Sequence, residues 1–358
     1  MKWMQKVLML LAMASLACTG WVFWGPARPF AAEPEELILT ISAAGDVTHG
    51  GDRRKGTDLF AKELARQDGD YTFPFRNVRH LFEASDLTIV NYEGTLTKAP
   101  PITKNSFSFA GAPENVQALV LGGINAVALD NNHVRDHGYK GYEDTKKTLE
   151  EAGILFSGYE QGAVYETRGV RIGMLSYNTL RVGYRSIHER LPNDIQELRD
   201  QGCALVIVSY HWGYERDYMP HGRQITLGRA TVDAGADLVL GHHSHVISPI
   251  ELYNGKYICY SLANFSFAGN RNPSDKDTFI FQQRFRITDG VAEDAGMRIV
   301  PCRVSSIPNR NDLIPTPYDI EDAQRIASKL VELGKQLEYA LTEYPLEFSE
   351  QGTVNSEQ

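Results

Sequence analysis

The sequence has 358 residues, 42% hydrophobic residues and a formal net charge of -9, so it carries enough apolar material for a large core. No Lys/Arg run is longer than Arg53-Arg54-Lys55, and a nucleic-acid partner is therefore not expected, because binding a phosphate backbone requires a clustered basic face. Beyond the N-terminal segment the cysteines are Cys203, Cys259 and Cys302, an odd and widely spaced set that does not form a disulfide framework.

Residues 1–32 differ in character from the rest of the chain. Lys2 and Lys6 precede an apolar stretch, residues 7–24, which approaches the roughly 17–25 residues needed to cross a bilayer. Positive charge before such a stretch keeps that end in the cytoplasm. We therefore expect a signal peptide or an N-terminal membrane anchor, with the rest of the chain at the extracellular face of the membrane, or secreted if the signal is cleaved. Cys18 is a lesser candidate for lipidation, since the apolar run continues past it.

Short apolar runs that end in polar residues are typical of buried strands. Five such runs are residues 37–42, 87–90, 126–129, 204–208 and 236–240. Helical patterns lie at residues 139–152, 192–201, 223–234 and 320–342. The alternation of the two kinds of segment predicts an α/β fold.

Two dipeptides predict hairpin turns between β-rich segments, Arg168-Gly169 and Asp289-Gly290, so the sheets are expected to be mixed. The chain contains neither an internal repeat nor a low-complexity linker. We therefore expect one domain over residues 37–345 and a polar tail over residues 346–358.

Metal-binding residue types stand at the ends of all five predicted strands. In chain order they are Asp46, Glu93, Asn132 with His133, His211, and His243 with His245. Because ligands of α/β sheets gather at the carboxyl ends of strands, we expect these side chains to meet. Oxygen and nitrogen ligands without a thiolate suit Mn, Fe or Zn. A carboxylate among them can bridge two ions roughly 3.5–4 Å apart, so the sequence predicts a site for two divalent ions.

Each cluster alone has a simpler structural interpretation. Gly45-Asp46 is also typical of a turn, and His211 could be a core histidine. His133 followed by Asp136 is more informative, since a carboxylate that orients an imidazole is an acid–base arrangement. Three histidines within residues 242–245 are difficult to explain without a metal.

The clusters form one ordered set along the chain. It reads Gly45-Asp46, Asn91-x-Glu93-Gly94, Asn131-Asn132-His133-x-x-Asp136-x-Gly138, His211-Trp212-Gly213-x-Glu215, Gly241-His242-His243-x-His245 and Ser261-Leu262-Ala263-Asn264-Phe265. This set resembles the CapA/PgsA family, capsule-synthesis proteins linked to poly-γ-glutamate and similar to the calcineurin-like metallophosphoesterases. The resemblance extends from about residue 38 to residue 303.

The resemblance implies a four-layer α/β/β/α sandwich with mixed sheets, of the metallo-dependent phosphatase type. By position, Asp46 would hold the first ion, while Asn132 and His211 would hold the second. Of His243 and His245, one would join each ion.

Further roles follow from the same resemblance. His133 would be the protonating histidine, with Asp136 as its orienting partner, and Glu93 would bridge the ions. Additional candidates for metal or substrate contact are His49, Asn91, Glu215, His242 and Asn264.

Three positions depart from the expected patterns. His49 follows Asp46 one residue later than in the Asp-x-His motif of the wider superfamily. Asn91-x-Glu93 replaces a Gly-Asp-x-x-Asp motif, so bridging falls to Glu93 or is lost. Ala263 stands where the capsule family usually has glycine.

The resemblance and the N-terminal segment together predict a membrane-tethered extracellular factor in poly-γ-glutamate capsule synthesis or export. The partners would be the polymer, or another cell-surface polymer, and membrane-bound synthesis subunits. One alternative is a metal-dependent hydrolase of a phosphoester, or of a polymer or cell-wall amide, unrelated to the capsule. Another is a non-catalytic assembly subunit that keeps the metal site for stability.

Charge limits how a polyanion could bind. Without residues 1–32 the formal charge is -9 - 3 = -12, because that segment carries three basic residues and no acidic one. A polyanion would be repelled over a Debye length of about 8–10 Å, so contact would have to be local. Candidates for a local basic groove are Arg181, Arg185, His221 and Arg223.

Overall fold

The computed structural model describes residues 36–102, 106–158 and 161–349, which belong to one compact unit that begins at Glu36. The predicted signal or anchor, residues 1–32, lies outside the described residues, as do residues 350–358 of the predicted tail. Within the described ranges, no helix has both the length and the apolar character needed to cross a bilayer.

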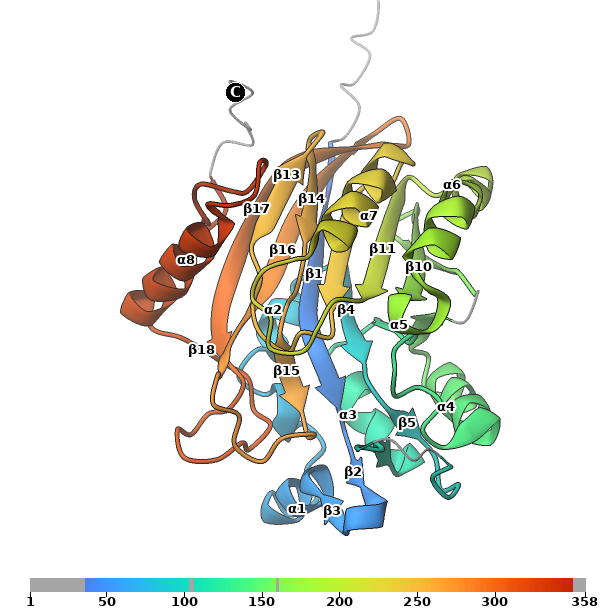
Figure 1. Ribbon diagram of the computed structural model, residues 1–358, viewed down its shortest axis with the longest axis vertical. Coiled ribbons are helices and arrows are strands. Elements are labelled where there is room, and N and C mark those ends of the chain that lie inside the picture. The colour runs from blue at the N-terminus through green and yellow to red at the C-terminus, as the bar shows by residue number, and fades with distance from the viewer. Residues whose placement is uncertain (1–35, 103–105, 159–160, 350–358) are drawn as a thin grey trace, which may run out of the picture. The chain divides into compact units, whose positions relative to one another are not determined.

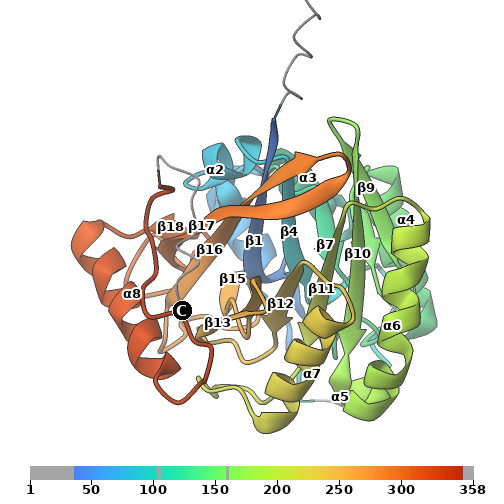
Figure 2. The same ribbon diagram turned by 90° about the horizontal axis from the view of Figure 1, so that it is seen from above.

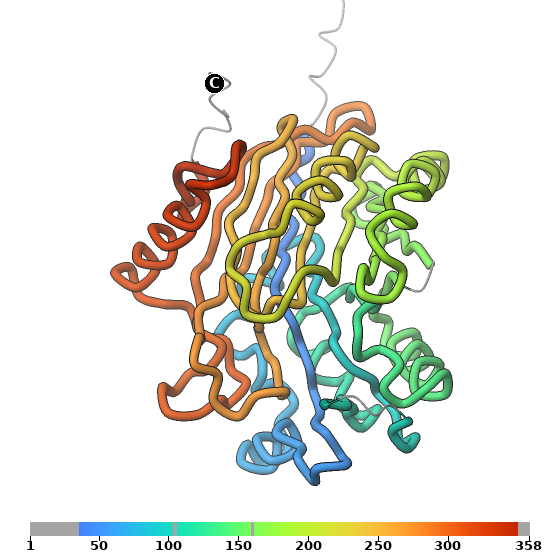
Figure 3. The backbone as a smooth tube through the Cα atoms, viewed as in Figure 1, coloured from blue at the N-terminus to red at the C-terminus, as the bar shows by residue number. Residues whose placement is uncertain are grey.

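The first large sheet has eight strands, with β1 (Leu37–Thr48) near its centre. β1 runs parallel to β4 (Leu87–Tyr92) and antiparallel to β16 (Asp277–Thr288), so segments far apart in the sequence lie side by side (Figure 3). The other strands are β7 (Ala126–Ala128), β8 (Leu155–Ser157), β15 (Asn264–Phe267), β17 (Val291–Arg303) and β18 (Thr316–Pro317).

The second large sheet has six strands in the order β13-β14-β12-β11-β10-β9. β10, β11, β12 and β14 are parallel, whereas the edge strands β9 and β13 are antiparallel to their neighbours. The bounds are β9 (Ala163–Thr167), β10 (Val170–Asn178), β11 (Leu205–His211), β12 (Leu238–His242), β13 (Ile250–Tyr253) and β14 (Lys256–Cys259). A small third sheet contains β2 (Gly51–Asp52), β3 (Thr57–Asp58), β5 (Thr95–Leu96) and β6 (Ala110–Gly111).

Side chains that alternate along the strands divide the interior into separate cores. Ile41 and Ile207, one from each large sheet, meet in a core between the sheets. Val206 and Val208, the neighbours of Ile207, point to the opposite face of their sheet and pack against helices. Strands buried on both faces explain the nearly continuous apolar runs in the sequence.

Helices cover both outer faces of the sandwich. α2 (Arg79–Glu83), α3 (Val116–Leu121) and α4 (Gly138–Glu151) contribute to the core outside the first sheet. α6 (Tyr184–Asp200) and α7 (Gly222–Asp233) contribute to the core outside the second sheet (Figures 1 and 2). The fold is thus an α/β/β/α sandwich with mixed sheets, and the predicted fold class is confirmed.

The remaining helices are short or peripheral. They are α1 (Leu59–Arg66), α5 (Thr179–Val182), α8 (Ile320–Gly334) and the 3-10 turns η1 (Arg53–Lys55), η2 (Phe73–Phe75) and η3 (Pro113–Asn115).

Two predicted helix boundaries are wrong. The helix predicted to begin at residue 192 begins instead at Tyr184 and contains Pro192. The chain tolerates this proline because the backbone carbonyl that loses its hydrogen-bond donor belongs to His188, an exposed residue that water can reach. The helix predicted over residues 320–342 ends at Gly334, and the chain then turns back so that Ala340 forms a bridge with Glu251.

Both predicted hairpin turns are confirmed. Arg168 and Gly169 have φ angles of 49° and 79°, and they join β9 to β10. Asp289 and Gly290 have φ angles of 52° and 78°, and they join β16 to β17. Two consecutive positive φ angles are the signature of the type I′ turn.

Candidate metal centre

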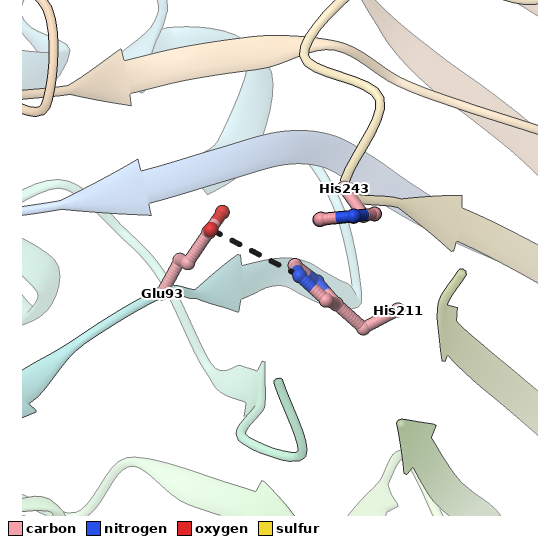
Figure 4. Close-up of side chains that lie close together, drawn as sticks. All are labelled: Glu93, His211 and His243. Carbon is pink, nitrogen blue, oxygen red and sulfur yellow. Dashed lines mark ion pairs between the residues drawn. The ribbon is translucent and has the colours of Figure 1, made fainter. Parts of the chain in front are cut away.

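Glu93 lies at the centre of the predicted site. It follows β4 directly and is 0% exposed. Its Oε1 atom lies 3.8 Å from His133 Nε2, 3.9 Å from His211 Nε2 and 3.9 Å from His245 Nε2. Figure 4 shows the Glu93 carboxylate and the rings of His211 and His243 directed toward one another. Strands of both large sheets therefore deliver side chains to one point.

Five predicted ligand side chains fall into two groups that share one member. Glu93, His211 and His243 form one group, and Asp46, Glu93 and His245 form the other. In each group the ligand atoms lie within 4.8 Å of one another. Glu93 belongs to both, which is the arrangement expected of a carboxylate that bridges two ions.

The hydrogen-bonding state of these side chains fits a pair of cations. Several buried acceptor atoms have no hydrogen-bond partner among the described residues. They are both carboxylate oxygens of Glu93, Asn132 Oδ1, His211 Nε2 and His243 Nδ1. Each such buried atom costs about 1–3 kcal/mol when left unsatisfied. A cluster of orphaned carboxylate, amide and imidazole atoms is what a divalent metal would satisfy.

The protonation states of His211 and His243 agree with this donor set. Burial lowers the pKa of His243 to about 4 and holds the pKa of His211 well below its usual value. Both imidazoles are therefore neutral near pH 7, and a neutral imidazole is the form that binds metal. Burial also raises the pKa of Glu93 to about 7, because its negative charge is costly in the interior without a cation beside it.

Backbone strain is concentrated in the histidine loop after β12. His243 and His245 have φ angles of 96° and 59°, which L residues other than glycine rarely adopt. Strain of this kind costs on the order of 1–3 kcal/mol per residue and persists where the surrounding structure enforces it. Ala263 has a φ of 62°, a backbone conformation that favours glycine.

His133 is held in one orientation beside Glu93. Its Nδ1 atom lies 2.7 Å from Asp136 Oδ2, and the same oxygen accepts the N–H of Phe109 at 2.8 Å. Burial alone lowers the pKa of His133, but the hydrogen bond to Asp136 and the negative charges nearby outweigh burial and raise it. With Nδ1 bound to Asp136, Nε2 is the atom directed toward the metal centre.

Asn91 connects the two ligand groups. Its side-chain N–H donates to Asp46 Oδ1 at 2.8 Å, and the same nitrogen lies 3.5 Å from His211 Nδ1. Its Oδ1 lies 3.4 Å from Asn131 Nδ2. Asn91 therefore positions ligands from β1 and β11.

The remaining candidates lie in different places. His242 Nδ1 is 3.4 Å from Asp46 Oδ1, and both of its ring nitrogens are without hydrogen bonds among the described residues. Asn264 pairs with Asp46 across β1 and β15 and donates to the backbone oxygen of His245 at 3.3 Å. Glu215 is exposed and belongs to neither ligand group.

His49 packs among aromatic rings, away from both ligand groups. Its ring stacks on Phe60 at 4.6 Å and lies 5.6 Å from Phe75, and its Nε2 is 3.3 Å from Ser266 Oγ. Burial lowers the pKa of His49 to about 3. The extra residue between Asp46 and His49 turns this ring into the core.

We expect His49→Phe to reduce the loss of folding stability at acid pH. The pKa of His49 is lowered in the folded state, so its contribution to stability is complete above the unfolded value of about 6.5 and is lost as pH falls toward 3. Between pH 7 and pH 4, the metal-free wild type should lose on the order of 3 kcal/mol more than the variant in urea unfolding. Ser266 keeps its bond to the Leu313 carbonyl in the variant.

The control is His188→Phe, because His188 is exposed. Equal losses for wild type and His49→Phe over this pH range would contradict the expectation.

Some neighbours of the site carried no clear sequence signal. The Phe109 ring lies 4.5 Å from that of His133, and the Phe267 ring lies 4.9 Å from that of His245. Asn131, although part of the matched pattern, acts through its side-chain bonds to Tyr92 O and His133 N. Aromatic residues in loops have no periodicity that would identify them in advance.

Comparison with known proteins shows which family the chain is similar to. The family model described as bacterial capsule synthesis protein PGA_cap matches residues 40–268. The capsule biosynthesis protein CapA of Bacillus anthracis is 30% identical over 292 residues, which are 74% of this chain and 68% of that protein. The PGA biosynthesis protein CapA of Bacillus subtilis (strain 168) is 32% identical over 251 residues, which are 64% of this chain and 63% of that protein.

A solved structure to which the chain is similar is the calcineurin-like phosphoesterase YfkN of Bacillus subtilis. It aligns with a TM-score of 0.40 at 14% identity, over 83% of this chain and 98% of that one.

Proposed function

Because this chain belongs to the PGA_cap family of bacterial capsule synthesis proteins, we propose that it acts in poly-γ-glutamate synthesis or export as a metal-dependent hydrolase. Relatives named for capsule biosynthesis support the polymer-related role. The basic and apolar composition of residues 1–32 supports tethering to the extracellular face of the membrane.

The single observation that carries the hydrolase part is the shared position of Glu93 in two ligand groups. The residues that would hold one ion are Glu93, His211 and His243, and those for the other are Asp46, Glu93 and His245. When bound, two such ions polarise a water and stabilise the charge that develops on a phosphoryl or acyl oxygen.

Residues of the chain itself would supply orientation and a proton. His133 donates a proton from Nε2 to the leaving group, since Asp136 holds its Nδ1 at 2.7 Å. Asn91 keeps Asp46 in place through its 2.8 Å hydrogen bond. Phe109 and Phe267 pack against His133 and His245 and limit the access of bulk water.

We expect the full-length protein to bind near two divalent ions per chain and His243→Ala to retain about one. His243 belongs to one ligand group only, so the group of Asp46, Glu93 and His245 survives in the variant. Turnover should fall on the order of 100-fold or more. The measurement is elemental analysis beside assays of a generic phosphodiester and of poly-γ-glutamate chain length.

The matched control is His221→Ala, because His221 is an exposed histidine paired with Asp217 at 3.0 Å and belongs to neither group. It should keep both ions and full turnover of the phosphodiester. A folded wild-type protein with one ion or none, inactive on both substrates, would contradict the hydrolase proposal and favour a non-catalytic assembly role.

A further inference from the structure

A pair of buried serine hydroxyls joins the histidine loop after β12 to the segment before β15. Ser244 lies between His243 and His245, and its Oγ atom is 2.8 Å from Ser261 Oγ. Ser244 is 6% exposed and Ser261 is 1% exposed. The contact is therefore shielded from bulk water, and a buried polar group that loses such a partner is costly.

The Ser261 hydroxyl also fixes the backbone that leads into β15. Ser261 Oγ accepts the N–H of Ala263 at 3.2 Å, and the carbonyl oxygen of Ala263 accepts the N–H of Asp46 at 2.9 Å. Ala263 has a φ of 62°, so its peptide groups depend on such bonds to keep their place. A continuous set of hydrogen bonds thus leads from Ser244 through Ser261 and Ala263 to Asp46.

These bonds connect residues of both metal-ligand groups. His243 belongs to one group, while Asp46 and His245 belong to the other. His243 and His245 have φ angles of 96° and 59°, and such a backbone persists only where surrounding contacts enforce it. The carbonyl oxygen of Ser244 accepts the N–H of Arg216 at 2.7 Å. The backbone and the side chain of Ser244 are therefore both held at the point between the two histidines.

The two serines differ in what their removal would break. Ser244 Oγ lies 2.9 Å from Val246 O as well as near Ser261, so alanine at position 244 would also lose a contact within the histidine loop. The contacts of Ser261 Oγ reach Ser244 and Ala263, on the two sides that it joins. Substitution of Ser261 is therefore the sharper test of the connection.

We propose that Ser261 is a positioning residue of the metal centre, whose hydroxyl sets the separation of the two ligand groups. It acts through Ser244 on the histidine loop and through Ala263 on Asp46, and it contacts neither an ion nor a substrate itself. Side chains that orient metal ligands typically change metal affinity 10–100-fold when they are removed. This proposal rests on the proposed function, because it concerns the ions assigned there.

The test compares Ser261→Ala with Ser305→Ala in the full-length protein. Ser305 is the matched control, because it is 0% exposed and lies in the loop after β17. Its Oγ atom lies 2.8 Å from Arg310 O and 2.9 Å from Asp312 Oδ1. Each variant thus removes a buried, hydrogen-bonded hydroxyl, so a difference between them does not come from general loss of packing.

The first measurement is titration with Co²⁺ followed by visible absorption, because the absorption bands of this ion report the geometry of its ligands. We expect Ser261→Ala to raise the Kd for Co²⁺ about tenfold and to shift the bands. Ser305→Ala should leave both the Kd and the bands of wild type unchanged.

The second measurement is amide hydrogen exchange of the metal-free protein, which depends on neither metal binding nor hydrolysis. The amides of Asp46 and Arg216 report on the two sides that Ser261 joins. Their exchange is measured relative to the amide of Val206 in β11, which reports on opening of the second sheet. We expect it to be about tenfold faster in Ser261→Ala and unchanged in Ser305→Ala.

A second variant keeps the proposal testable if Ser261→Ala does not fold. Ser244→Ala removes the other hydroxyl of the pair and should produce both changes. Where all variants fold, the double variant should raise the Kd for Co²⁺ by less than the product of the two single effects, because both substitutions break one contact. Effects that multiply would show that the hydroxyls act independently, contrary to the proposal.

The outcomes separate this proposal from the proposed function. Faster exchange at Asp46 and Arg216 together with weaker Co²⁺ binding supports the role of Ser261. Unchanged exchange at both amides, or equal Kd values for Ser261→Ala and Ser305→Ala, would overturn it. A wild-type protein that binds no Co²⁺ would count against the proposed function, and the exchange of the metal-free protein would then decide the role of Ser261.

Discussion

Substitution of Glu93 by glutamine will abolish the binding of both metal ions, whereas loss of a ligand from one group removes one ion. Glu93 is the residue common to the two ligand groups, and its two carboxylate oxygens have no hydrogen bonds among the described residues. Glutamine has nearly the same shape but no negative charge. We expect metal content to fall from near two ions to near zero and turnover to fall on the order of 1,000-fold. Elemental analysis beside the turnover assay measures both.

The same variant should remain folded without metal, so the loss would not reflect unfolding. Burial raises the pKa of Glu93 to about 7, and a carboxyl with a raised pKa contributes stability that is lost as pH rises from about 4.3 through 7. At pH 8 the metal-free Glu93→Gln protein should therefore be at least as stable as metal-free wild type. Glu293→Gln, an exposed acidic control on β17, should keep both ions. A Glu93→Gln protein that retains one ion would show that Glu93 does not bridge.

The sequence was sufficient to predict the strands that deliver the ligands. Each of the five apolar runs lies in a strand, and the last four are in strands buried on both faces. Such runs are recognisable without any contact information. The polar residues after those strands were identified by type. Their meeting followed from the rule that ligands gather at the carboxyl ends of parallel strands.

The separate roles of the polar residues within the site could not be predicted from the residue types alone. Asn91 was a candidate for metal or substrate contact, and the structure places it between Asp46 and His211 as a hydrogen-bonding link. His49 was also a candidate, and its ring packs on Phe60. Which side of the backbone a polar side chain occupies depends on the register of strands such as β1 and β15, and this register is a long-range property.

The ends of the helices were the other feature that the sequence did not predict. Pro192 lies inside α6, although proline usually marks a boundary, because α6 packs through Ile187, Leu191 and Ile195 on both sides of it. Burial of this apolar face outweighs one missing backbone hydrogen bond, and tertiary packing is not visible in local sequence.

Gly45 should be the least replaceable glycine beside the metal centre, and Gly45→Ala should destabilise the fold by at least about 3 kcal/mol. A Cβ at this position would lie 1.9 Å from the Ala263 carbonyl oxygen and 2.7 Å from that of Leu262, and both obstacles are backbone atoms that cannot rotate away. The close approach exists because the N–H of Asp46 donates to Ala263 O at 2.9 Å, which aligns β1 with β15. Urea unfolding of the metal-free protein measures the cost.

The same substitution should also weaken the ion held through Asp46, because separating β1 from β15 moves that carboxylate away from His245, whose Nδ1 now lies 3.0 Å from Asp46 Oδ2. Gly222→Ala is the matched control, since a Cβ at Gly222 meets nothing within 4 Å at the start of α7, and alanine there should be neutral or stabilising by up to about 1 kcal/mol. If Gly45→Ala were as stable as Gly222→Ala and kept both ions, the contact between β1 and β15 would not be what positions Asp46. A destabilised protein that binds one ion would instead show that the geometry of the metal centre depends on the absence of a side chain at Gly45.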